Sequence, residues 1–129
     1  MSASFVTFNP SGSWEGEGKE FRLARSSNVV ESGKLKLTKL VKKYQGNVYK
    51  VTDTYYFPDG SVNYGPANYL INTNGTNNFI CSDDSGSGID NYLFNNKQMT
   101  FTYDLNGIPE DVDPLFQSLN AVYNLVKKN

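Results

Sequence analysis

The chain has 129 residues, 38% apolar and 19% charged, with 12 basic and 13 acidic side chains and no histidine. This length predicts one soluble domain, residues 1–129, that folds without a metal or a disulfide. The lack of histidine excludes Ser/His/Asp and Cys/His nucleophile pairs and histidine-ligated zinc or haem.

The first ten residues, 1–10, lack the basic start and apolar core of a signal peptide, and no run is long and apolar enough for a membrane span. We therefore expect a cytoplasmic protein. The single cysteine, Cys81, cannot form an internal disulfide and is expected to be a small buried apolar residue. Nine Tyr, eight Phe and 11 Gly favour strands and turns over helices.

Turn residues recur roughly every 10 to 15 positions along the chain, which predicts an antiparallel up-and-down sheet of eight strands. Pro58–Gly60 is the strongest turn, because proline presets its φ and glycine takes a positive φ. The full set of reversals is Ser32-Gly33, Gln45-Gly46, Pro58–Gly60, Asn74-Gly75, residues 83–88, Asn95-Asn96 and Asn106-Gly107.

The segments between these turns alternate in polarity, as half-buried strands do. Leu35 and Leu37 share one face, whereas the step to Leu40 and Val41 breaks the alternation and predicts a β-bulge. An open sheet of this size would leave two exposed edges, so we expect it to close into a barrel with an interior.

The C-terminal segment has two interpretations. Asp113-Pro114 resembles a helix start, and apolar residues then recur at helical spacing, which predicts a helix over 113–127. Strict alternation from Leu119 to Val126 instead predicts a strand over 119–127. We favour a short helical turn at 113–118 followed by that strand.

The most specific motif is Gly12-x-Trp14-x-Gly16-x-Gly18, in which an indole is expected to cover the closed end of a barrel. This motif resembles the start of the calycins, the lipocalin-like and nitrobindin-like small barrels. The resemblance implies an eight-stranded barrel whose last strand, containing residues 122–127, pairs with the first. It also implies a cavity for a small, mainly apolar molecule. Nitrobindin-like proteins hold haem through histidine, which this chain lacks, so haem is not implied unless a tyrosine serves as the axial ligand, and no cofactor is expected.

Aromatic residues are the main candidates for lining such a cavity. Tyrosine exceeds phenylalanine, and buried phenols need hydrogen-bond partners, which a ligand with polar groups can supply. Ordinary core packing is the alternative for each ring. The predicted ligand-binding residues are Trp14, Arg22, Tyr55, Tyr69, Tyr92, Phe101, Tyr103 and Tyr123.

Three charged residues are further candidates. Glu20 and Arg22 share parity with Trp14 and point inward unless a bulge in the glycine-rich stretch reverses them. An inward arginine could bind a carboxylate of the ligand. Asp53 shares parity with Val51 and predicts either a buried acid, catalytic together with Glu20 in an enzyme, or a partner of a neighbouring lysine.

Other charged stretches predict little chemistry. The lysines between residues 34 and 50 are expected to form the wet face of strands rather than a nucleic-acid site. The acidic stretch 82–88 lacks the ligand spacing of a calcium loop, so no metal is expected.

These observations favour a binding protein that holds a small hydrophobic or aromatic molecule, as a monomer or homodimer. The alternative is a cyclase-, isomerase- or chromophore-lyase-like enzyme on the same scaffold, which would act mainly by holding its substrate in a reactive conformation. A third interpretation, a packed barrel acting through its outer surface, predicts no cavity. A carboxylate facing the ligand would favour catalysis, and an all-aromatic cavity would favour carriage.

Overall fold

The protein is all-β in the computed structural model, which describes residues 8–65, 67–72, 77–82 and 89–128. Its strands are β1 (Gly12–Ala24), β2 (Val29–Glu31), β3 (Leu35–Gln45), β4 (Val48–Tyr56), β5 (Val62–Tyr64), β6 (Asn68–Asn72), β7 (Asn78–Ser82), β8 (Ile89–Asn95), β9 (Gln98–Leu105) and β10 (Phe116–Lys127).

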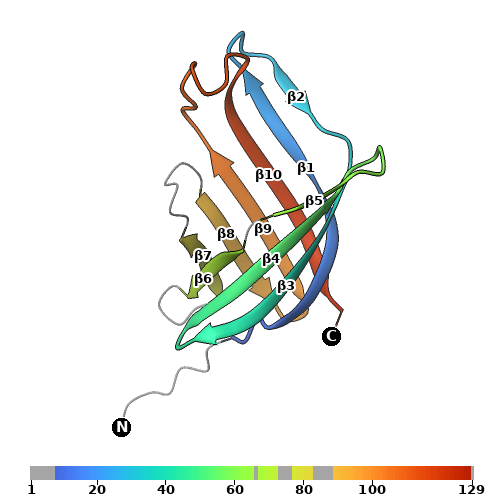
Figure 1. The fold of residues 1–129 in the computed structure, drawn as a ribbon, viewed down its shortest axis with the longest axis vertical. Coiled ribbons are helices and arrows are strands. Elements are labelled where there is room, and N and C mark those ends of the chain that lie inside the picture. Colours follow the sequence, from blue (N-terminus) through green and yellow to red (C-terminus); the bar gives the residue numbers. More distant parts are fainter. Residues whose placement is uncertain (1–7, 66, 73–76, 83–88, 129) are drawn as a thin grey trace.

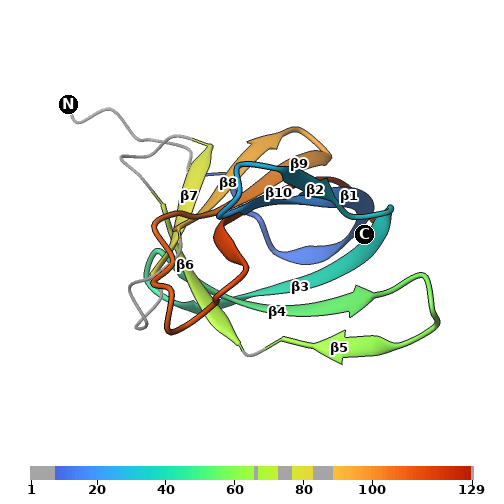
Figure 2. The same ribbon diagram turned by 90° about the horizontal axis from the view of Figure 1, so that it is seen from above.

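Eight of these strands form a closed antiparallel barrel, as the turn spacing predicted. Each pairs with its neighbour in the order β10-β9-β8-β7-β6-β4-β3-β1, and β10 pairs with β1 to close the ring. The two short strands lie outside this ring, β2 against β1 and β5 against β4. Figure 1 shows β1 and β10 side by side along their length. From above, β3 and β4 run along one side and β8 to β10 along the other (Figure 2).

The turns use the residues that turn chemistry requires. Gly60 has a φ of 89°, and the Asp59 carboxylate accepts the backbone N–H of Ser61 at 2.9 Å. Asn96 has a φ of 57° in the two-residue connection from β8 to β9. The predicted turn at Asn74-Gly75 lies outside the described residues. So does the acidic stretch 83–88, and so do residues 1–7 of the N-terminal segment.

The predicted bulge between Leu37 and Val41 was wrong. β3 pairs with both β1 and β4 without a shift in this region, and the irregularity lies farther on, between Lys43 and Gln45. The inward residues are Leu35, Leu37, Lys39 and Val41, while Leu40 is 42% exposed. The prediction failed because it assumed that every lysine on this strand faces water.

The predicted helical turn at 113–118 was also wrong, whereas the closing strand was right. The Asp113 side chain accepts the backbone N–H groups of Leu115 and Phe116 at 3.0 and 3.1 Å, and β10 begins at Phe116. The described residues contain no helix. The segment pairs with β1 on one side and β9 on the other, which favours the strand periodicity over the helical one. A helix could not form backbone hydrogen bonds with either neighbouring strand.

The glycine motif serves the closure of the barrel. A Cβ at Gly16 would lie 1.9 Å from the Asn124 carbonyl oxygen on β10, so only glycine allows this approach. Trp14, two residues before Gly16, is fully buried, and its Nε1 donates to the Pro10 carbonyl at 2.9 Å. Its ring packs against Phe94 at 5.2 Å. The end of the barrel that contains Trp14 is solid, because buried apolar side chains fill it.

Candidate functional site

The other end of the barrel holds a cavity of about 520 Å³. Seven strands contribute to its wall, with the segments next to them, and the lining combines aromatic rings, carboxylates and amides. The lining residues are Glu20, Asp53, Tyr55, Phe57, Asn63, Gly65, Asn68, Asp90, Phe101, Tyr103, Leu119, Ala121 and Tyr123.

A buried ion pair lies between the cavity and the solid end. The Lys39 side chain is fully buried, and its Nζ donates to Asp53 Oδ2 at 2.7 Å and to Tyr92 Oη at 2.9 Å. The same nitrogen lies 3.6 Å from the centre of the Phe101 ring, close enough for a cation–π contact. Lys39 and Asp53 are directly opposite each other on β3 and β4. We call Lys39, Asp53, Tyr92 and Phe101 the floor of the cavity.

Burial in the floor and the wall shifts the pKa values of four titratable side chains. Burial lowers the pKa of Lys39, and the nearby Asp53 carboxylate opposes that shift. Burial also raises the pKa values of Tyr55, Tyr92 and Tyr123, with nearby carboxylates adding to the effect. These phenols therefore stay protonated, and each can donate a hydrogen bond.

Two buried polar atoms have no hydrogen-bond partner among the described residues, Asp53 Oδ1 and Tyr123 Oη. Both residues line the cavity. An unpaired buried donor or acceptor costs about 1–3 kcal/mol, so such atoms are uncommon in a finished core. Because both residues line the cavity, a polar group of a ligand is a candidate partner for these atoms.

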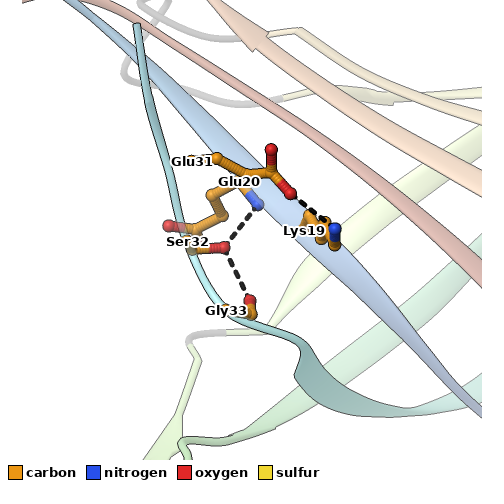
Figure 3. Close-up of polar contacts among 5 residues, drawn as sticks. All are labelled: Lys19, Glu20, Glu31, Ser32 and Gly33. Carbon is orange, nitrogen blue, oxygen red and sulfur yellow. Dashed lines mark hydrogen bonds and ion pairs between the residues drawn. The ribbon is translucent and has the colours of Figure 1, made fainter.

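The backbone of Glu20, a residue of the cavity lining, is held by the segment that follows β2. The Ser32 hydroxyl accepts the Glu20 backbone N–H at 2.8 Å, and the Ser32 N–H donates to the Glu20 carbonyl at 2.8 Å. Figure 3 shows the first of these contacts, beside an ion pair between Lys19 and Glu31. These bonds fix the backbone of β1 between its pairing with β3 and its pairing with β2.

The structure places six of the predicted site residues in the lining of the cavity: Glu20, Asp53, Tyr55, Phe101, Tyr103 and Tyr123. Tyr92 belongs to the floor but does not line the cavity. Trp14 packs in the solid end and does not reach the cavity.

Arg22 keeps the inward register, since no bulge interrupts β1 before Leu23. Its side chain is nevertheless 45% exposed and does not line the cavity. At the end of the barrel its guanidinium lies 3.5 Å from the Glu20 carboxylate and 5.8 Å from the Phe116 ring centre. The predicted role of Arg22 as an interior anchor for a ligand carboxylate therefore has no support in this geometry.

Tyr69 faces outward, contrary to the prediction. It is 37% exposed and packs edge-on against Tyr44 at 5.1 Å. The reason is register: Leu70 lies opposite Tyr49 and Cys81, all three buried, so Tyr69 points to the other face of β6. The buried position of Cys81 agrees with its prediction.

Sequence reasoning missed two charged residues of the site, Lys39 and Asp90. Lys39 was grouped with the surface lysines, although it continues the inward set of Leu35, Leu37 and Val41. The Gly46-Asn47 turn lies midway between Lys39 and Asp53, so the hairpin itself pairs them. Asp90 gave no comparable signal because it follows a stretch without regular alternation.

A second depression, of about 550 Å³, lies on the outer face over β1 and β10. It is shallow, and exposed charged side chains such as Glu17 and Lys36 form its border. The interior cavity, with its buried polar atoms, is therefore the candidate site.

No protein-family model matches the chain, and a search of the curated proteins finds no match. The barrel is compatible with a calycin-like fold. Among the described residues no helix is long and apolar enough to cross a membrane.

Proposed function

We propose that this protein is a calycin-like binding protein that holds one small molecule with an apolar or aromatic body inside its barrel. The ligand would occupy the space above the floor and contact Tyr55, Phe101, Tyr103 and Tyr123. The observation that carries the proposal is a cavity of about 520 Å³ lined by two residues with buried polar atoms, Asp53 Oδ1 and Tyr123 Oη, that have no partner in the described part of the chain.

Size and lining both support this function. Ligand pockets generally measure roughly 300–1,000 Å³ and combine apolar walls with a few placed polar groups. The rings of Phe101 and Tyr123 stack at 5.9 Å, and that of Tyr55 meets Tyr123 edge-on at 6.2 Å. These rings offer an aromatic ligand faces and edges to pack against, in preferred aromatic geometries.

The test uses the protein recovered from its native cells, with native mass spectrometry to detect a bound small molecule. Ala121→Phe is the cavity variant, because Ala121 is buried and lines the cavity. Val122→Phe is its matched control, because Val122 is the next residue of β10 and is 42% exposed on the outer face. We expect a ligand mass on the wild type and on Val122→Phe but not on Ala121→Phe. A wild type without any bound molecule, and without affinity for a neutral apolar dye such as Nile red, would contradict the proposal.

An enzyme on the same scaffold is a second candidate, favoured by one observation. Asp53 and Glu20 both line the space that the ligand would occupy, and Asp53 Oδ1 has no hydrogen-bond partner among the described residues. A carboxylate in that position can take up or release a proton of a bound substrate. Chromatography of the co-purified molecule before and after incubation with fresh protein separates the two functions. Conversion that Glu20→Gln abolishes would indicate catalysis, and an unchanged molecule would indicate carriage.

A further inference from the structure

We propose that the ligand of this cavity is an organic cation, a protonated amine carried on an aromatic or apolar body. This inference rests on the proposed binding function and specifies its ligand class. Four features of the cavity lead to it: its charge, its unpaired polar atoms, its rings and the spread of its carboxylates.

The charge of the wall is negative. Carboxylates come from three strands, Glu20 on β1, Asp53 on β4 and Asp90 on β8, and the lining contains no described lysine or arginine. Lys39 reaches Asp53 from the floor, through Oδ2 only. Arg22 meets Glu20 at 3.5 Å, with a side chain 45% exposed. Acidic groups around a space of low dielectric constant favour a cation and disfavour a carboxylate or phosphate ligand.

The unpaired atoms require a donor. Asp53 is 7% exposed and Tyr123 is 1% exposed, yet Asp53 Oδ1 and Tyr123 Oη have no partner among the described residues. A carboxylate oxygen can only accept a hydrogen bond, and a phenol oxygen can accept one as well as donate. A protonated primary amine carries three N–H donors, so it can supply hydrogen bonds to acceptors of both kinds.

The aromatic rings complement the same charge. Lys39 already places an ammonium 3.6 Å from the centre of the Phe101 ring, so a wall of this cavity accommodates a cation on one face of a ring. Phe101 stacks with Tyr123, which in turn meets Tyr55. A second ammonium inside the cavity would meet the same kind of surface, where a desolvated cation–π contact stabilises it.

The arrangement fits an organic cation better than a metal ion. Among the described residues no group of three or more acidic or cysteine side chains lies close enough together to hold a metal. The carboxylates are instead spread around about 520 Å³. A charge attached to a body of several carbon atoms fills that space, whereas a bare ion would leave most of it empty.

A matched series of indoles tests the inference. Tryptamine carries a cation, tryptophol is neutral and indole-3-acetate is an anion, while the aromatic body is the same. Isothermal titration at pH 7 with the full chain should give tryptamine at least about tenfold tighter binding than tryptophol, a difference of about 1.4 kcal/mol. Indole-3-acetate should bind more weakly than tryptophol.

Charge variants provide the second readout. Glu20→Gln should reduce the preference for tryptamine over tryptophol by about threefold or more. The matched control is Glu17→Gln, which removes the same charge from the outer face of the same strand, where Glu17 pairs with Lys34 at 3.4 Å. The control should keep the full preference.

The outcomes separate this inference from the proposed function. Tryptophol or indole-3-acetate binding as tightly as tryptamine would overturn the cation inference and leave the binding function standing. An equal loss of preference in Glu20→Gln and Glu17→Gln would overturn it too, because the effect would then come from the overall charge. If no indole binds, the cation inference fails. If the wild type also carries no bound molecule and does not bind Nile red, the proposed binding function fails as well.

Discussion

Replacing Lys39 with methionine should destabilise the barrel far more than an ordinary lysine substitution. The change removes the cation that donates to Asp53 Oδ2 at 2.7 Å and to Tyr92 Oη at 2.9 Å. It leaves the Asp53 carboxylate buried with neither oxygen paired, since Oδ1 already lacks a partner among the described residues. Breaking a buried ion pair from one side costs about 3–5 kcal/mol.

The expected shift is large enough for simple assays. In a domain of this length about 1 kcal/mol lowers Tm by roughly 4 °C, so Lys39→Met should lower Tm by roughly 12–20 °C. Urea unfolding at pH 7 measures the same free energy from the midpoint, and the slope should stay unchanged if the folded state keeps its shape.

Lys36→Met is the matched control, because Lys36 lies on the same strand with its side chain on the outer face, 5.6 Å from the Tyr56 ring centre. It should change the free energy of unfolding by less than about 0.5 kcal/mol. The double variant Lys39→Met/Asp53→Leu should recover most of the lost stability, because neither buried charge remains. A loss under about 1 kcal/mol in Lys39→Met, or no recovery in the double variant, would show that the buried ion pair does not stabilise the fold in this way.

Three further predictions follow from the same contacts. Tyr123→Phe removes a buried hydroxyl without a described partner, so calorimetry should find Tm unchanged or raised while affinity for the bound ligand falls; a Tm lower by more than about 5 °C would contradict this. Gly16→Ala places a Cβ 1.9 Å from the Asn124 carbonyl and should lower Tm by more than about 10 °C, whereas Gly33→Ala meets no atom within 4 Å and should change it little. The pKa values of Tyr55, Tyr92 and Tyr123 are raised in the fold, so their contribution to stability is fully present below about pH 10, where unfolded phenols begin to ionise, and is lost as the pH rises further. Absorbance titration near 295 nm should show phenols that ionise late, together with unfolding. Full ionisation of all tyrosines in the folded protein would contradict their burial.

Much of the fold could be predicted because it depends on local chemistry. Turn residues such as Asn96 and Gly60 set the hairpins, and alternation from Leu119 onward set the closing strand. The helical turn at 113–118 failed because Asp113 caps the entry to a strand with the same side-chain bonds that would start a helix. Local signals cannot distinguish these outcomes, since the neighbouring strands decide between them.

The site was only partly predictable, because register across strands determines which side chains face inward. Tyr69 looked like an interior ring until its pairing placed Leu70 inside instead. Lys39 looked like a surface charge, and only its position opposite Asp53 accounts for its burial. Polarity alone assigns a buried charged residue to the wrong face, since its partner lies on another strand.

The most direct test of the central claim is methyl NMR during a titration with tryptamine or tryptophol, whichever binds more tightly. Leu119 and Ala121 line the cavity, whereas Val122 and Val126 on the same strand are 42% and 44% exposed on the outer face. If the ligand binds inside the barrel, we expect saturable shifts of the Leu119 and Ala121 methyl signals at one ligand per chain, with the Val122 and Val126 signals nearly unchanged. Shifts confined to the two valines, or Leu119 and Ala121 signals unmoved by bound ligand, would contradict it.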